Sequence, residues 1–319
     1  MFVKYASLMK RRRFIDKAVN HTYQRTICGF NIFYEVEDYL VYYTIFSVMA
    51  HRYDVTVYGL CLMIDHIHSL CASNEKINFS MFMSNVANVF VKEYNEEHHC
   101  SGCLFGERFG SAPKLGLKLL RTALAYLYNN PVERHLCKYA QEYRWNFLAF
   151  AQYSNPFSAP LIMRRASPAL RRAIAEVNGS RERGNHLTYP QLKRFFTSLD
   201  DREKNQLIDY IIVRYSVIRY DILTTSCYDG YQNMITAINS NAGSEYDIVE
   251  QRDGRSDVQF RELYKFVHNR GFVSAGEVIS LDVDSKISLH NDMLRLTDAS
   301  SFQICKFLHL RIEKPGWSR

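Results

Sequence analysis

Two histidines separated by a single residue, His66 and His68, have the types and spacing of a metal-binding pair. In an extended strand, residues two apart point to the same face, so both imidazoles would project together while Ile67 packs behind them. Two neighbouring neutral imidazoles are good ligands for a divalent metal. The same spacing also fits a structural pair in which one ring is packed and the other is solvated.

A tyrosine and an asparagine, Tyr126 and Asn130, lie four residues apart just before Pro131. On a helix these two side chains share a face, whereas Tyr128 and Asn129 point elsewhere. A phenol and a carboxamide one turn apart could present a nucleophile beside a metal ligand. The alternative interpretation is an aromatic helix end that carries polar residues before a proline.

Short β-rich runs and amphipathic helices alternate along residues 20–150, and this alternation must position both pairs. The expected strands are 21–28, 54–63, 66–72 and 104–109. The expected helices are 35–51, 79–94 and 115–129, the last stopped by Pro131, which continues a helix only at a cost. This order predicts an α+β fold: a ferredoxin-like or RRM-like antiparallel sheet with helices on one face.

The strand signals fade after residue 150, where Pro156, Pro160 and Arg164-Arg165 indicate a linker. The remainder is expected to be mostly helical. Its expected helices are 260–268, 285–296 and 300–310, residues 239–254 are expected to form a polar loop, and 207–220 fit either a helix or a strand. The sequence therefore predicts two domains, a catalytic domain 1–153 and a helical C-terminal domain 154–319.

The composition is that of an ordinary globular protein, with 47% hydrophobic and 23% charged residues in a chain of 319. A net charge of +7 moderately favours anionic partners such as nucleic acid. The eight cysteines are widely spaced, and no secretory signal or membrane-spanning apolar run is expected. A cytoplasmic setting with reduced thiols fits best, and no membrane partner is expected.

Four segments, taken together, resemble a known family. They are Tyr23-Gln-Arg-Thr26, residues 57–68 ending in Ile64-Asp65-His66-Ile67-His68, Leu104-Phe-Gly-Glu-Arg-Phe109, and Tyr126-Leu-Tyr-Asn-Asn-Pro-Val132. In order and spacing they look like the REP-associated tyrosine transposases, within the single-tyrosine HUH transposases, over roughly residues 15–150. The chain departs from the pattern at Ile64-Asp65, where the family more often has Pro-Asn. Asp65 could strengthen metal binding or cap the turn.

The resemblance implies an HUH palm in which His66, His68 and Asn130 bind Mg²⁺ or Mn²⁺ and Tyr126 is the nucleophile. It implies cutting of single-stranded DNA, on hairpin-bearing ends, through a 5′-phosphotyrosine link with a free 3′-hydroxyl. Reversal onto a new 3′-end would rejoin DNA without ATP, and no phosphate-binding Gly-x-x-x-x-Gly-Lys-Ser/Thr loop is present. The implied setting is a bacterial cytoplasm.

Given a DNA substrate, basic residues of the first half are candidate phosphate contacts. They are Arg25, Arg108, Lys114, Lys118 and Arg121, together with the run Lys10–Arg13. Phe105 and Phe109 could stack on bases or be buried under the sheet. The segment His98-His-Cys-Ser-Gly-Cys103 contains histidines and cysteines, the usual ligands of zinc, but a second ligand pair at zinc-finger spacing is missing. It is interpreted as a loop.

Residues 286–291 and 300–310 have a pattern typical of a helix-turn-helix. Ser300 would cap the second helix, and Ser301, Gln303 and Lys306 would be exposed on it. The alternative is a helical lid that packs on the catalytic domain.

Two other functions remain open at this point: a domesticated DNA-binding protein that no longer cuts, and a replication or mobilisation relaxase that shares the chemistry. The oligomeric state, monomer or homodimer, is also open.

Overall fold

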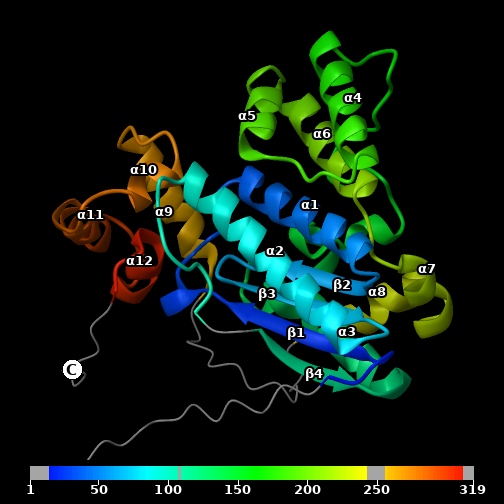
Figure 1. The fold of residues 1–319 in the computed structure, drawn as a ribbon. Helices are drawn as coiled ribbons and strands as arrows, with labels where there is room; N and C mark the ends of the chain where they lie inside the picture. Colours follow the sequence, from blue (N-terminus) through cyan, green and yellow to red (C-terminus); the bar gives the residue numbers. More distant parts are fainter. Residues whose placement is uncertain (1–13, 107–108, 243–255, 312–319) are drawn as a thin grey trace, which may run out of the picture.

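A computed structural model describes residues 14–106, 109–242 and 256–311. Its centre is a four-stranded antiparallel sheet in the order β2-β3-β1-β4 (Figure 1). The strands are β1 Val19–Arg25, β2 Thr56–Leu62, β3 His66–Ala72 and β4 Gly110–Lys114. β3 is buried along its whole length because it lies between β2 and β1. The α+β class and the antiparallel sheet predicted from the sequence are confirmed.

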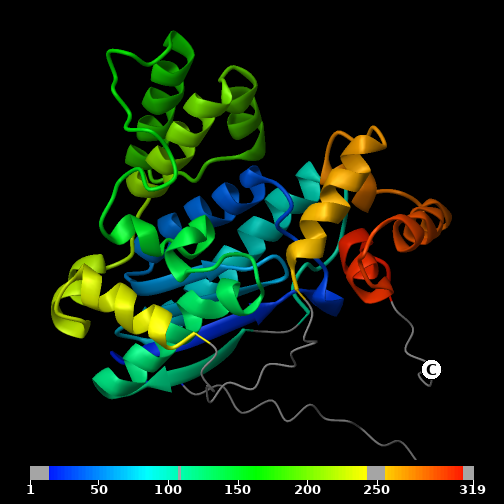
Figure 2. The same ribbon diagram turned by 180° about the vertical axis from the view of Figure 1, so that it is seen from behind.

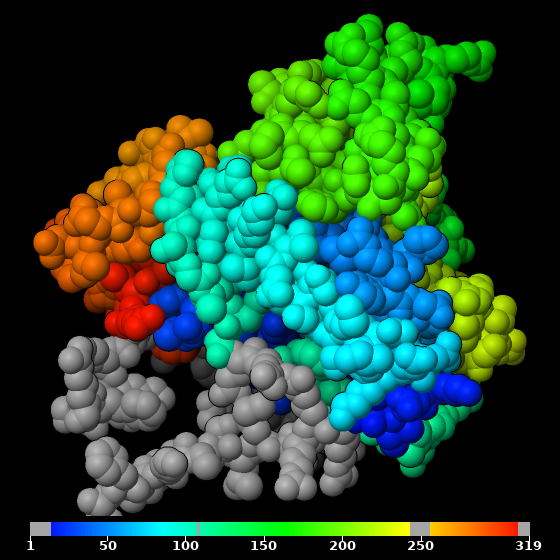
Figure 3. Space-filling model, in the orientation of Figure 1, coloured from blue at the N-terminus to red at the C-terminus, as the bar shows by residue number. Residues whose placement is uncertain are grey.

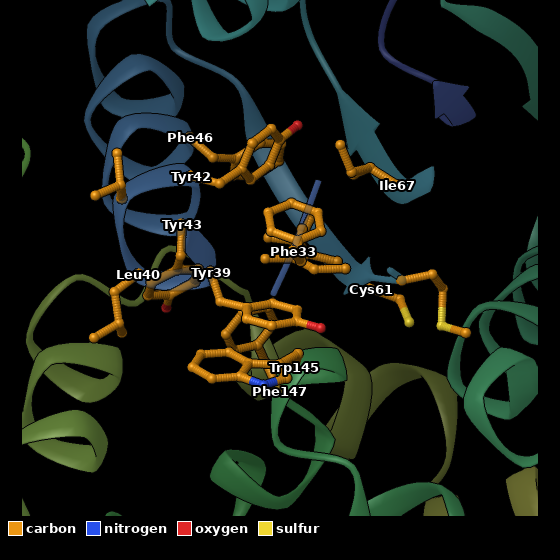
Figure 4. Packing of buried hydrophobic residues seen from close by; sticks show 14 of the residues in the cluster. Phe33, Tyr39, Leu40, Tyr42, Tyr43, Phe46, Cys61, Ile67, Trp145 and Phe147 are labelled. Carbon is orange, nitrogen blue, oxygen red and sulfur yellow. The ribbon is translucent and has the colours of Figure 1, made fainter. Parts of the chain in front are cut away.

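Three long helices accompany the sheet: α1 Val36–Arg52, α2 Lys76–Glu97 and α3 Gly116–Glu133. The expectation that the helices share one face is wrong. α3 packs on the face that carries His66 and His68, where a Cβ atom added at Gly59 would lie 3.5 Å from Leu127 of α3. Ile67 points to the opposite face, on which Tyr42 and Phe46 of α1 pack (Figure 4).

The fourth strand lies later than predicted. Residues 104–109 were expected to pair, but among the described residues of that segment Phe105 forms only an isolated bridge with Thr26. The pairing with β1 falls instead on Gly110–Lys114, at the edge of the sheet, where the missing N–H of Pro113 is tolerated. The apolar character of 104–109 reflects burial of Leu104 in the core and not a strand.

The last helix of the sheet domain also ends later than predicted. α3 runs through Pro131 to Glu133. A proline removes one helical hydrogen bond, and here that loss falls in the last turn. Arg134 N still donates to Asn130 O at 3.1 Å, so the turn closes after the proline and Asn130 stays on the helix.

The remaining elements are short helices. Before residue 154 they are η1 Ile27–Gly29, η2 Ala140–Glu142, η3 Arg144–Asn146 and η4 Leu148–Ala151. After it they are α4 Pro168–Glu182, α5 Tyr189–Thr197, α6 Asp201–Arg214, α7 Tyr220–Ile222, η5 Leu223–Cys227, α8 Tyr231–Ser240, α9 Val258–Asn269, α10 Ala275–Ile279, α11 Val283–Leu296 and α12 Ser301–Leu308. The mostly helical C-terminal half is confirmed, and the open segment 207–220 is helical up to Arg214.

The C-terminal half surrounds the sheet domain on several sides. α4, α5 and α6 stack beyond α1, while α9 to α12 lie at the other end, beside α2 (Figures 1 and 2). In the space-filling view, both groups of helices border the surface formed by α1 and α2 (Figure 3). No helix in the described ranges is long and apolar enough to cross a membrane.

Buried apolar residues of both halves form one continuous cluster. Aromatic rings dominate it: Tyr39 stacks on Trp145 at 4.3 Å between ring centroids, and Tyr43 stacks on Phe147 at 4.4 Å (Figure 4). The two-domain division at residue 153 stays a prediction, since the core runs across it.

The exposure expected on the final helix is wrong at two of three positions. Ser300 caps α12 as predicted, by accepting from Gln303 N, and Ser301 is exposed. Gln303 and Lys306, however, are both 5% exposed. Gln303 closes the capping box with Ser300 and Lys306 pairs with Asp65, so neither side chain faces solvent as a DNA-reading residue would.

Candidate active site

The two histidines of β3 lie on the same face of the sheet as Tyr23 and Arg25 of β1. In the antiparallel register, His68 is opposite Tyr23 and His66 is opposite Arg25. Alternation along β1 then places His21 on this same face. α3 crosses this side of the sheet, so that Tyr126 and Asn130, one turn apart, both point toward the histidines.

His66 is held from two sides. Its Nδ1 lies 2.6 Å from Asp65 Oδ1, and its Nε2 lies 3.3 Å from Asn130 Oδ1. Burial acts to raise the pKa of Asp65, but Lys306 and His66 outweigh it and hold that pKa far below its ordinary value. Asp65 is therefore an ionised carboxylate that accepts a hydrogen bond from His66 Nδ1–H. In the neutral His66 ring, the lone pair of Nε2 then faces Asn130.

His68 forms the second corner of the site. Its Nδ1 lies 3.1 Å from His21 Nε2, and its ring is 5.0 Å from that of His66 at an angle of 87°. The ring of Tyr126 packs edge-on against both His68 and His21, at centroid distances of 5.4 Å and 5.6 Å. The structure thus brings together all four residues singled out from the sequence, and adds His21.

These side chains are deeply enclosed. Tyr126 is 2% exposed, Asn130 5% and His66 3%. The hydroxyl of Tyr128, by contrast, lies beside Gly59 of β2. Burial raises the pKa of its hydroxyl strongly, which makes Tyr128 a poor nucleophile. Of the two tyrosines, only Tyr126 lies beside the histidines.

The donor set, two imidazoles and one amide oxygen, can bind a divalent cation. His66 Nε2 and Asn130 Oδ1 present two lone pairs to each other at 3.3 Å, an arrangement that a cation between them would satisfy. Neighbouring ligands of an octahedral Mg²⁺ lie about 3 Å apart, because each is about 2.1 Å from the ion. In both histidines Nδ1 contacts a protein group, so Nε2 is the nitrogen that would bind metal.

No group of three His, Cys, Asp or Glu side chains suited to a metal occurs within the described ranges. The set formed by His66, His68 and Asn130 is of a different kind, since its third member is an amide. The zinc-like segment is also accounted for: His98 Nε2 pairs with Asp38 at 2.8 Å, and Cys100 donates to Asn95. It precedes β4 as a loop, as predicted, and none of the eight cysteines, all in the described ranges, forms a disulfide.

One comparison with known proteins gives a match. Residues 11–130 fit the family model described as IS200-like transposase. Over these residues the chain is similar to the IS200-like transposases. Neither the curated proteins nor the solved structures contain a match. The matched segment includes His66, His68 and Tyr126 and ends at Asn130, so the whole candidate site lies inside it. A transposase family implies an enzyme that cuts and joins DNA.

The IS200-like segment also contains the basic residues expected to contact DNA. Arg25, Lys118 and Arg121 are exposed and Lys114 is half-buried. Arg121 also donates to Cys227 O and lies 5.5 Å from the ring centre of Tyr228, which orients it against the C-terminal half. Arg108 and the run Lys10–Arg13 lie outside the described residues. The DNA-contacting role of all of them stays a prediction.

Phe105 and Phe109, weighed as base-stacking residues, are half-buried. Phe109 contacts Phe79 edge-on at 5.9 Å, and Phe105 lies 6.5 Å from Phe90. Both rings pack against α2, which favours the core alternative.

Sequence reasoning missed His21 beside the site, and it missed that Lys306 contacts Asp65. His21 was predictable, because the alternation His21, Tyr23, Arg25 matches that of β3. Asp65 was considered either as an aid to metal binding or as a cap of the turn; its carboxylate contacts His66 and Lys306, and its effect on metal binding stays a prediction. Lys306 carried no signal, because it is 241 positions from Asp65.

Proposed function

We propose that this protein is a metal-dependent single-stranded DNA endonuclease and strand transferase that acts through a 5′-phosphotyrosine intermediate on Tyr126. One observation supports this above the others: the Tyr126 ring packs against His68 and His21 at 5.4 Å and 5.6 Å, while Asn130, one turn on, reaches His66. A nucleophile and a set of metal ligands are thereby adjacent. The match to the IS200-like transposase model supports the coarser statement, a DNA transposase.

In this proposal the Tyr126 oxygen attacks the scissile phosphorus. The new bond joins phosphorus to tyrosine, the bond to the 3′-oxygen breaks, the phenol loses its proton and the 3′-oxygen gains one. A tyrosine of ordinary pKa about 10 attacks slowly at neutral pH, so the surroundings must stabilise both oxygens. α3 fixes the tyrosine within reach of the histidine face, and the phosphodiester energy is kept for rejoining.

His66, His68 and Asn130 would hold Mg²⁺ or Mn²⁺. When bound, the ion would polarise the scissile phosphate and offset charge on the departing oxygen. Asp65 fixes the His66 ring so that its Nε2 faces Asn130, and His21 does the same for His68 through Nδ1.

The substrate we propose is single-stranded DNA with a hairpin at its end, which rests on the resemblance to the REP-associated transposases. Arg25, Lys118 and Arg121 would contact phosphates from the exposed side of β1 and α3. A bacterial cytoplasmic setting belongs to the same proposal.

The test is formation of a covalent adduct. Incubation with a hairpin oligonucleotide and Mn²⁺ should give a protein–DNA species that survives denaturation. Tyr126→Phe should abolish it and leave binding of the oligonucleotide nearly unchanged. Tyr128→Phe is the matched control, since that hydroxyl lies two residues along and faces Gly59. An adduct that persists in Tyr126→Phe would overturn the assignment of the nucleophile.

A further inference from the structure

A buried lysine of the C-terminal half, Lys306, contacts a residue of the candidate site. Lys306 of α12 has a side chain that is 7% exposed, and its Nζ donates to Asp65 Oδ2 at 2.5 Å. Its ammonium also lies 5.5 Å and 5.6 Å from the ring centres of Phe302 and Phe260. A buried charge in such surroundings is costly unless it is paired, so the geometry of this pair is strongly determined.

The carboxylate of Asp65 is shared between two partners. Oδ2 accepts from Lys306, and Oδ1 accepts from Nδ1 of His66 at 2.6 Å. Its backbone oxygen is held as well, because it accepts from both N and Oγ1 of Thr26 at 3.1 Å and 3.0 Å. The carboxylate is therefore fixed between the lysine and the histidine.

The segment after β1 is shaped around this lysine. Gly29 has φ +69°, and a Cβ atom there would lie 3.4 Å from Lys306 Cε and 4.0 Å from Asp65 Oδ2. Asn31 N donates to Lys306 O at 3.2 Å, which ties the backbone of α12 to the same segment. The residues from β1 to α1 thus enclose the lysine and its partner.

We propose that Lys306 is a positioning residue for metal binding: it holds Asp65, and through Asp65 it holds His66 with Nε2 toward Asn130. This inference rests on the proposed function. It makes the docked C-terminal helix a part of the metal site, although α12 contributes no ligand. Groups bonded directly to a metal-binding histidine, as Asp65 is to His66, change metal affinity by roughly ten- to a hundred-fold when removed. Lys306 acts one step further back, through Asp65.

The test measures Mn²⁺ binding directly, by calorimetry and by electron paramagnetic resonance of the full-length protein. Lys306→Met keeps the apolar stem and removes the charge, so we expect Mn²⁺ to bind roughly tenfold more weakly, at the lower end of the effect of a direct partner. Lys306→Arg keeps the charge and should recover part of the affinity. Because Lys306→Met leaves Asp65 buried without its cation, Asp65→Asn and the double variant Lys306→Met, Asp65→Asn are compared as well. If Lys306 acts through Asp65, the double variant should bind Mn²⁺ about as well as Asp65→Asn alone, and a further loss in the double variant would contradict that route.

The matched control is Arg144→Met. Arg144 and Asp209 also form a buried ion pair, with the guanidinium 4.9 Å from the ring centre of Phe157, but they lie away from the histidines. This variant should lose thermal stability and keep its Mn²⁺ affinity. Equal Mn²⁺ binding in Lys306→Met and wild type, or an equal loss in Arg144→Met, would overturn the inference alone. Absence of Mn²⁺ binding in the wild type would overturn the proposed metal site as well.

Discussion

Asn130 shows how much of the chemistry depends on a single side chain. Its Oδ1 is the atom that faces His66 Nε2, and no carboxylate occupies this position. We expect Asn130→Leu, which keeps the volume and removes the donor atoms, to weaken Mn²⁺ binding at least roughly tenfold. Asn130→Asp should bind Mn²⁺ more tightly than the wild type, because it replaces an amide oxygen with a charged one. Calorimetric titration of the three proteins measures this, and unchanged affinity in Asn130→Leu would exclude Asn130 as a ligand.

Tyr128 gives a residue-scale prediction of the opposite kind. Its hydroxyl is fully buried and has no hydrogen-bond partner among the described residues. Removing an unsatisfied buried hydroxyl is neutral or stabilising, by about 1 kcal/mol at most. Tyr128→Phe should therefore unfold at an equal or slightly higher denaturant concentration while adduct formation continues. A loss of stability beyond that amount would show that the hydroxyl has a partner.

At the scale of elements, one polar cluster joins three helices. Asp38 of α1 accepts from His98, just after α2, and from Tyr189 of α5, each at 2.8 Å. Burial acts to lower the pKa of His98, but the Asp38 carboxylate outweighs it, with help from Glu35 and Glu97, so the pKa is raised from 6.5. The folded state therefore retains the proton on His98 to a higher pH than the unfolded chain does.

The sign of the pH dependence follows from that shift. Stabilisation by protonated His98 is fully present below the unfolded-state pKa and is lost as the pH rises through the higher folded-state pKa. His98→Gln cannot titrate, so the difference in free energy of unfolding between wild type and variant should shrink as the pH rises above about 6.5, the ordinary pKa of histidine. Denaturant unfolding at several pH values measures it; a constant difference would contradict the raised pKa.

The elements whose bounds were misjudged share a physical cause. Residues 104–109 have strand-like composition, yet the sheet accepts Gly110–Lys114 at its edge instead. Pro131 has a strong local tendency to stop a helix, yet α3 continues through it, because the buried face from Ala123 to Pro131 packs against the sheet and η2. In both cases tertiary packing outweighs a local preference of the backbone.

At the scale of the whole molecule, the two halves are bonded at many points. Tyr43 OH donates to Ile212 O, Arg219 N to Val57 O, and Asn129 Nδ2 to Ile238 O, at 2.9, 2.9 and 2.7 Å. Tyr34 OH donates to Phe307 O at 2.6 Å. These bonds involve α1, β2 and α3, so the C-terminal half covers three elements of the sheet domain.

A fragment 1–153 should therefore fail to fold alone. Truncation would expose apolar side chains now buried by the C-terminal helices, and such surfaces aggregate. We expect the fragment to be insoluble when expressed alone and to become soluble when residues 154–319 are co-expressed. Size-exclusion chromatography and circular dichroism provide the measurement. A soluble fragment that binds Mn²⁺ as tightly as the full chain would contradict this expectation and would show an autonomous catalytic domain.

The sequence by itself determined the local geometry of the candidate site. Alternation along the strand puts His66 and His68 on one face of the strand. The helical period puts Tyr126 and Asn130 on one face of their helix, and neither result depends on the rest of the chain. Only the tertiary structure decided which groups stand behind them. The alternation of β1 puts His21 on one face of its own strand, but the pairing of β1 with β3 brings it to His68. Lys306 lies 241 positions from Asp65, and a contact at that separation depends on the packing of the whole chain rather than on any local pattern.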